Sequence, residues 1–328
     1  PSSAASDVYK RQGVLGEALE AYLGEGAEHR LFIEGGPVLP FLREAAEMGI
    51  GGERLAAVLE EVRRFQARAR RTLRRRTEEA PVGGVRLRAF GFGVSRVEKD
   101  GVPILASDWS TTTARHLFFY LLSHPPRTRE QIGADLWPDL RPFRLAGTFH
   151  NTKYRMQQAL GLNPVVFRDG LYTVRDDLDV WYDVAEFERL IERARRSPPV
   201  KRIWHLRQAI GLYKGDFLQD CYADWAQVRR ERLRQQYLEA VAEVADWMLE
   251  RGRLDEAIVL LQRALEVERT REDFHRGLMR AYALMGRADE AIDQYRRCER
   301  ILREEIGVEP SPRTQALFRA IWEGSFPP

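Results

Sequence analysis

The sequence has only two cysteines and no long hydrophobic run, and these two features exclude several classes of protein. Cys221 and Cys298 lie far apart, without the short spacing of a zinc-binding pair, so neither a disulfide framework nor a zinc site is expected. No apolar stretch approaches the roughly 18 residues of a membrane span, and no basic-then-apolar signal peptide opens the chain. We therefore expect a protein of the reducing cytoplasm that makes no contact with a membrane.

The sequence also lacks the motifs of the common enzyme classes. It contains no Walker loop, no GxSxG nucleophile motif and no HExxH metal motif. The six histidines are scattered along the chain, and the carboxylates alternate with arginines in a way typical of surface ion pairs on helices. The sequence therefore predicts a protein that is not an enzyme and needs neither a cofactor nor a metal.

The net charge of +3 is small but unevenly distributed. Residues 1–80 carry 13 basic and 13 acidic side chains, residues 81–176 carry 13 and 8, and residues 177–328 carry 26 and 28. The excess positive charge lies in the middle segment, which is therefore the best candidate for binding phosphate groups.

The first 80 residues are interpreted as a leader followed by helices. Residues 1–12 have no starting Met and no periodicity, so we expect them to be a non-native leader. Residues 13–80 show helical spacing, and residues 31–45 resemble the end of the helical-repeat region of large MalT-like regulators. That resemblance implies that the chain is the C-terminal part of a larger protein. Eight arginines in residues 63–76 fit either a basic arm on DNA or a solvated connector helix.

Residues 81–176 predict a small sheet followed by helices. Residues 85–91 alternate between polar and apolar side chains, and Asp100-Gly101 is a typical hairpin turn. Thr111 can cap a first helix, and Thr128 with Gln131 can form a capping box at the start of a second. A third helix is expected from about residue 143 to residue 160, and Asp169-Gly170 predicts a second hairpin turn. This order of elements is typical of a winged helix-turn-helix.

The third helix has one apolar and one polar face. Leu145, Phe149, Met156 and Leu160 are the expected buried positions. A helix fits the major groove of B-form DNA, where Arg suits guanine and Asn suits adenine. We therefore predict double-stranded DNA as the partner. The predicted DNA contacts are Thr148, His150, Asn151, Lys153, Tyr154, Arg155 and Gln158 on this helix and Arg168 beside the wing turn.

Residues 85–174 resemble the OmpR-type winged helix of the Streptomyces antibiotic regulatory protein family (SARP). The resemblance is carried by Phe90-Gly91, Ala114-Arg115, Leu136-Trp137-Pro138 and residues 154–161. The sequence departs from the family pattern at positions 157 and 158, where Gln replaces the common Arg. The resemblance implies a homodimer on direct repeats that recruits RNA polymerase. Part of that contact is expected from the loop before the third helix, through Asp139 and Arg141.

Residues 177–328 predict an all-α domain of the tetratricopeptide type. Residues 252–258 recur as residues 286–292, a period of 34 residues, which is the tetratricopeptide period. Residues 213–218 and 304–314 resemble the bacterial transcriptional activator domain (BTAD) that follows the winged helix in the SARP family. The predicted fold is mainly α: a short helical segment, an α+β winged helix, then a TPR-like domain.

Two interpretations of function follow. The first is a sequence-specific transcription activator that reads promoter DNA with the winged helix and contacts proteins through the TPR-like domain. The alternative is a helical-repeat adaptor whose winged helix does not bind DNA. Salt-dependent binding to duplex DNA separates them, because an adaptor would show none.

Five tryptophans in apolar helical contexts are expected to be core anchors rather than stacking platforms: Trp137, Trp181, Trp204, Trp225 and Trp247.

Overall fold

The computed structural model describes residues 57, 60 and 86–326. The chain divides at Pro81, and the description below concerns the unit Val82–Pro328. Nearly all of the predictions for residues 1–80 lie outside the described residues. In the part that the structure describes, no helix combines the length and the apolar character needed to cross a membrane.

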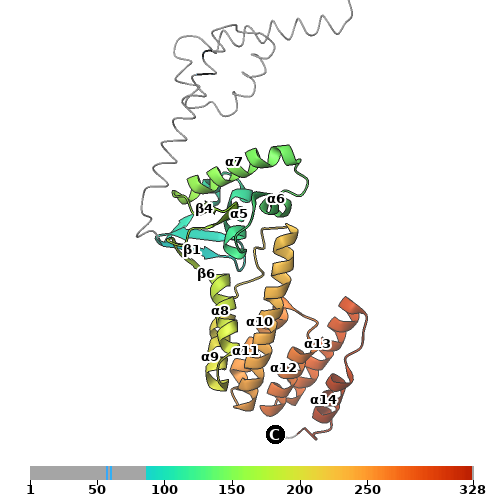
Figure 1. Ribbon diagram of the computed structural model, residues 1–328. Coiled ribbons are helices and arrows are strands. Elements are labelled where there is room, and N and C mark those ends of the chain that lie inside the picture. The colour runs from blue at the N-terminus through green and yellow to red at the C-terminus, as the bar shows by residue number, and fades with distance from the viewer. Residues whose placement is uncertain (1–56, 58–59, 61–85, 327–328) are drawn as a thin grey trace, which may run out of the picture. The chain divides into compact units, whose positions relative to one another are not determined.

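A four-stranded sheet opens the described part of the chain (Figure 1). Its strand order is β3-β2-β1-β6; β1 pairs antiparallel with β2 and parallel with β6. Asp100 and Gly101 both have positive φ, which confirms the predicted two-residue turn between β2 and β3. Leu87, Ala89 and Val97 are fully buried on the inner face of the sheet. The strands are β1 (Arg86–Phe90), β2 (Arg96–Lys99), β3 (Val102–Ile104) and β6 (Asp179–Tyr182).

Three helices and a hairpin pack beside this sheet, as the sequence predicted. The Thr111 hydroxyl accepts a hydrogen bond from the Ala114 N–H at the start of α5, and Thr128 with Gln131 forms the predicted capping box of α6. The elements are the 3₁₀ helix η1 (Ala106–Trp109), α5 (Thr112–Ser123), α6 (Arg129–Leu136), α7 (Pro142–Leu160), β4 (Val165–Arg168) and β5 (Leu171–Val174). The order of elements is that of a winged helix-turn-helix.

The second half of the described chain is helical. Its helices are α8 (Asp183–Arg195), α9 (Pro199–Leu212), α10 (Asp224–Glu250), α11 (Leu254–Val267), α12 (Glu272–Leu284), α13 (Ala288–Ile306) and α14 (Pro312–Trp322). The predicted 34-residue repeat recurs in detailed geometry. The Arg253 N–H donates to the Met248 carbonyl at 3.0 Å, and the Arg287 N–H donates to the Tyr282 carbonyl at 2.9 Å. Equivalent residues therefore close equivalent helix ends, as in tetratricopeptide repeats.

The tryptophan prediction is wrong at one position. Trp137, Trp181, Trp225 and Trp247 are half-buried, but Trp204 is 57% exposed. The cause is the register of α9, whose buried stripe is Ile203, Leu206, Ala209 and Ile210. A residue one position after Ile203 lies on the outer side of such a helix.

Strand β6 begins after the predicted domain boundary between residues 176 and 177. Because β6 supplies the fourth strand of the N-terminal sheet, a cut at that boundary would separate β1 from its parallel partner. The boundary itself stays a prediction.

Candidate nucleic-acid interface

Helix α7 begins at a proline and is followed by a glycine, the residue types that favour the start and the end of a helix. It begins at Pro142, one residue before the predicted start, and proline at the first helical position has no N–H to leave unpaired. It ends at Gly161, which adopts the left-handed conformation with φ 63°. The Lys99 ammonium donates to the Leu160 carbonyl at 2.9 Å, so β2 holds this end of the helix.

The inner face of α7 is fixed by apolar packing. Phe149, Met156 and Leu160 are fully buried, as predicted. The Phe149 ring packs edge-on against Tyr172 of β5, with the ring centroids 4.6 Å apart. Leu145 is half-buried rather than buried, and it packs on α6 at Gly133, where a Cβ would collide with the Leu145 side chain. The inner face therefore holds the outer face at a defined orientation.

The outer face of α7 carries most of the predicted DNA contacts. Asn151, Tyr154, Arg155 and Gln158 are exposed, and their spacing of three and four residues places them on one side of the helix. Within the described part of the chain, none of these four side chains has a hydrogen bond or an ion pair with another residue. They offer amide, hydroxyl and guanidinium groups of the kinds that read base edges.

The other three predicted residues of α7 lie at the edges of this face. His150 is exposed, with its ring edge toward Phe149. The Lys153 ammonium lies 5.8 Å from the centre of the Tyr172 ring. Thr148 is half-buried, and its carbonyl accepts a hydrogen bond from the Thr152 hydroxyl at 2.8 Å. Side chains at these positions are placed for contacts at the edge of a DNA major groove rather than with the base edges at its floor.

The predicted wing is the hairpin of β4 and β5. Its residues pair as Arg168 with Leu171, which leaves Asp169 and Gly170 as a two-residue turn in which both have positive φ. The Arg168 side chain is 72% exposed, and its guanidinium lies 3.8 Å from Asp176. Phe167 beside it is 58% exposed. The hairpin thus presents a cation and an aromatic ring at its tip.

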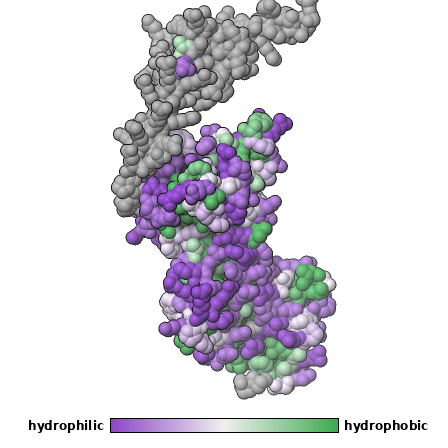
Figure 2. All heavy atoms as spheres, in the orientation of Figure 1, coloured by the Kyte–Doolittle hydropathy of each residue, from purple (hydrophilic) through white to green (hydrophobic). Residues whose placement is uncertain are grey.

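The loop between α6 and α7 leaves both of its predicted polymerase contacts exposed. Asp139 and Arg141 are exposed on either side of Leu140, whose N–H donates to the Trp137 carbonyl at 3.0 Å. Phe143 follows on the first turn of α7 and is 72% exposed. Figure 2 shows an apolar group of side chains at this end of α7.

The predicted contacts omitted two exposed side chains of this surface, Arg144 and Phe167. Apolar residues such as Phe167 are usually assigned to the core, yet Phe167 lies next to a cation, Arg168. The signal that could have found Arg144 is its spacing of seven and eleven residues before Asn151 and Arg155, which places it on the same helix face.

Behind the winged helix, one buried and one half-buried carboxylate join it to the helical domain. Asp183, at the start of α8, accepts hydrogen bonds from the N–H groups of Gly91 at 2.7 Å and Phe92 at 3.1 Å. Burial raises the pKa of Asp183 to about 6, although these donors oppose the shift. The first residue of α8 thus accepts hydrogen bonds from the backbone at the end of β1.

Asp220 makes the second connection. It accepts hydrogen bonds from the Ser95 N–H at 2.9 Å, the Ser95 hydroxyl at 2.6 Å and the Arg115 guanidinium at 2.7 Å, and His116 Nε2 lies 3.5 Å away. Burial would raise the pKa of Asp220, but His116 and Ser95 hold it below its usual range. Burial would lower the pKa of His116, but interactions with Asp220 and with the Cys221 side chain outweigh burial and raise the pKa to about 9.

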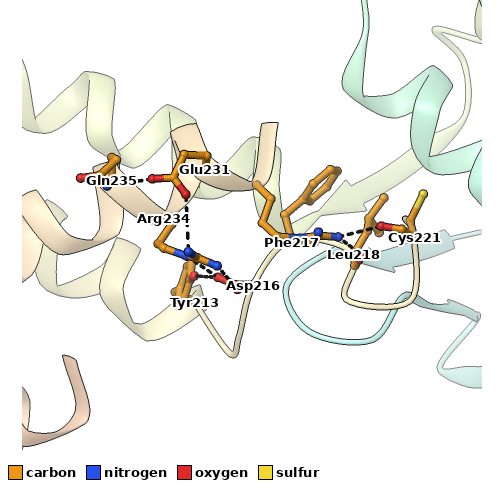
Figure 3. Close-up of polar contacts among 9 residues, drawn as sticks. Tyr213, Asp216, Phe217, Leu218, Cys221, Glu231, Arg234 and Gln235 are labelled. Carbon is orange, nitrogen blue, oxygen red and sulfur yellow. Dashed lines mark hydrogen bonds and ion pairs between the residues drawn. The ribbon is translucent and has the colours of Figure 1, made fainter. Parts of the chain in front are cut away.

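The connector between α9 and α10 is fixed from the other side by α10 (Figure 3). The Arg230 guanidinium donates to the carbonyls of Phe217, Leu218 and Cys221 at 2.6–2.8 Å. Arg234 pairs with Asp216 in the same connector. Since Asp220 lies within this connector, α10, the connector and α5 form a continuous polar junction.

Comparisons with known proteins agree with this architecture. Residues 182–322 match the family model of the bacterial transcriptional activator domain. Regulatory protein AfsR of Streptomyces coelicolor is 29% identical over 252 residues, which cover 74% of this chain and 25% of AfsR. Regulatory protein DnrI of Streptomyces peucetius is 34% identical over 149 residues, which cover 42% of this chain and 53% of DnrI. The chain thus spans about a quarter of AfsR and about half of DnrI.

A solved structure shares the fold. The Mycobacterium tuberculosis EmbR structure in complex with a low-affinity phosphopeptide matches with a TM-score of 0.58 and 21% identity, covering 73% of this chain and 66% of that chain. At this identity, the match concerns the fold alone. It supports the mainly α architecture with a small sheet in the winged-helix part.

Proposed function

Because residues 182–322 form a bacterial transcriptional activator domain and the relatives of this chain are SARP-type transcriptional regulators, we propose that it activates transcription by binding specific DNA sequences through α7. The observation that carries this proposal is the outer face of α7. Its four exposed polar side chains have no partner among the described residues, and Phe149, Met156 and Leu160 on the opposite face are fully buried. A packed helix with a solvent-exposed polar face suits the major groove.

Each part of the surface has a proposed role. Asn151 and Arg155 read base edges, and Tyr154 and Gln158 make mixed contacts on the same face. Thr148, His150 and Lys153 contact the backbone at the groove edge. Arg168 places a cation in the adjacent groove or against a phosphate, and its exposure supports this role.

We further propose that the protein works as a homodimer on direct repeats and recruits RNA polymerase through the loop before α7. The exposed pair Asp139 and Arg141, next to the exposed Phe143 ring, offers charged and apolar groups beside the DNA-reading face. Such a mixed surface suits a protein partner better than DNA phosphates.

The decisive experiment is to titrate the full chain with duplex DNA at several salt concentrations, after selecting bound sequences from random duplexes. An enriched motif and a steep negative dependence of log affinity on log salt would support the proposal. A chain that binds no duplex at any salt concentration would favour the adaptor alternative, in which the winged helix has a protein partner.

A further inference from the structure

The turn between α8 and α9 carries a basic and aromatic surface that DNA reading does not use. We call it the α8–α9 patch, and it comprises Arg193, Arg195, Arg196, Val200, Lys201 and Trp204. All six residues are exposed. Val200 is 73% and Trp204 57% exposed, and they lie one turn apart on α9, so they form one apolar strip.

The charge of the patch departs from that of its domain. Residues 192–202 contain five basic side chains and one acidic side chain, whereas residues 177–328 as a whole carry two more acidic than basic groups. Glu192 lies 3.5 Å from Arg195 and 2.7 Å from Arg196, so one carboxylate serves two guanidinium groups. The patch therefore keeps an excess of positive charge.

Helix stability does not account for this charge at the start of α9. The N-terminus of a helix favours acidic side chains and disfavours basic ones. The first turn of α9 has no acidic residue and contains Lys201 instead. Arg193 and Arg195, in contrast, lie in the last turn of α8, where cations do favour the helix. The helix dipole therefore does not explain Lys201, and burial in the core does not explain Trp204, which is 57% exposed.

The position of the patch favours a protein partner over nucleic acid. Helix α8 leads away from β6 and the sheet, and its 13 residues span about 20 Å. Figure 1 shows the α8–α9 turn at the end of α8 remote from β6, whereas α7 lies on the far side of the sheet. The patch therefore lies away from the face of α7 that is proposed to bind DNA.

We infer that the α8–α9 patch binds an acidic protein segment that also carries an aliphatic or aromatic side chain. The guanidinium groups would pair with its carboxylates, and Trp204 with Val200 would cover its apolar residue. This goes beyond DNA reading, and it can be tested without DNA.

The test uses the full chain and a fluorescent peptide of alternating acidic and aliphatic residues, followed by fluorescence anisotropy. Trp204→Ala and the double change Arg195→Glu with Arg196→Glu should each weaken peptide binding at least about tenfold. Matched controls exist on α13 and α14. Trp322→Ala removes a tryptophan of similar exposure, 62%, and Arg296→Glu with Arg300→Glu makes the same change in net charge. Both controls should bind like the parent.

Three results would overturn the inference. The first is absence of binding by the parent chain, and the second is an equal loss in patch and control variants. The third is a charge-reversed patch that weakens binding to duplex DNA as strongly as to the peptide, because that would assign the patch to nucleic acid. Circular dichroism of every variant keeps loss of folding separate from loss of binding. Failure of the chain to bind DNA would contradict the proposed function but leave this test intact.

Discussion

The outer face of α7 and the surfaces of the repeat helices contain similar residue types but use them differently. On the repeat helices, many of the arginines pair with nearby carboxylates, as Arg253 does with Glu256 and Arg287 with Glu290. On α7, Asn151 and Arg155 have no such partner within the described residues. Exposed ion pairs keep a helix surface hydrophilic and add little to the stability of the folded protein. Polar groups without a protein partner on a packed helix remain available to a ligand, and the proposed function rests on this availability.

The junction between these two regions is a third environment, in which charges are paired and largely shielded from solvent. Asp220 and Arg115 expose only 19% and 14% of their side chains. A buried pair contributes little net stability when it forms, but breaking it by removing one partner is costly. Substitutions in these three environments should therefore differ in the size of their effect and in whether they change folding stability or DNA binding.

The largest effect is expected at the junction. Asp220→Ala should lower the free energy of unfolding by about 2–4 kcal/mol, because the buried Ser95 and the half-buried Arg115 would lose their acceptor. Urea unfolding of the full chain measures this loss. The control Asp293→Ala removes a carboxylate that is 71% exposed and should cost less than about 0.5 kcal/mol. Equal losses would mean that the junction is no more tightly coupled than the surface.

The next effect concerns base reading. Asn151→Ala and Arg155→Ala should each weaken binding to the selected DNA site by about 1–3 kcal/mol, with little change on random DNA. Competition binding on the two DNAs measures the difference, and Arg296→Ala on α13 is the control. If losses on selected and random DNA are the same, both residues contact phosphates. If the variants unfold, the outer face of α7 has been misassigned.

These residues also show how far the sequence could lead. The order of elements, the Thr128 capping box, both hairpin turns and the outer face of α7 could all be predicted, because each depends on a local pattern of a few residues. The junction could not. Ser95 and Asp220 are 125 residues apart, and nothing near either of them specifies the other. Trp204 was misplaced for a related reason, since an apolar context in the sequence does not say which side of α9 faces the core.

A smaller effect links pH to the junction. The pKa of His116 in the folded chain, about 9, exceeds its ordinary value of 6.5. A raised pKa stabilises the fold fully below about pH 6.5, and this contribution is lost as pH rises through about 9. His116→Asn should therefore remove up to about 2 kcal/mol of stability near pH 6 and little above pH 9. Urea unfolding of the parent and the variant at both pH values measures this. A difference that does not change with pH would mean that His116 acts by packing rather than by charge.

The smallest effect is expected at the wing. Arg168→Ala should weaken binding to all DNA sequences alike and reduce the slope of log affinity against log salt by about one unit, because one phosphate contact would no longer release its counterion. Arg313→Ala, an exposed arginine at the start of α14, is the control and should leave the slope unchanged. An unchanged slope in Arg168→Ala would show that the wing does not touch DNA.

Asp176 sharpens this last prediction. Its carboxylate, 3.8 Å from Arg168, competes with phosphate for the same guanidinium. Asp176→Asn should therefore strengthen binding to all duplexes slightly. If Asp176 acts only by competing for Arg168, the double variant Asp176→Asn, Arg168→Ala should bind DNA with the same affinity as Arg168→Ala alone. A gain that persists in full without Arg168 would assign the effect to direct repulsion between Asp176 and DNA. The two carboxylates would then act differently. Asp220 holds Arg115 in place within the half-buried junction, whereas the exposed Asp176 would only repel DNA.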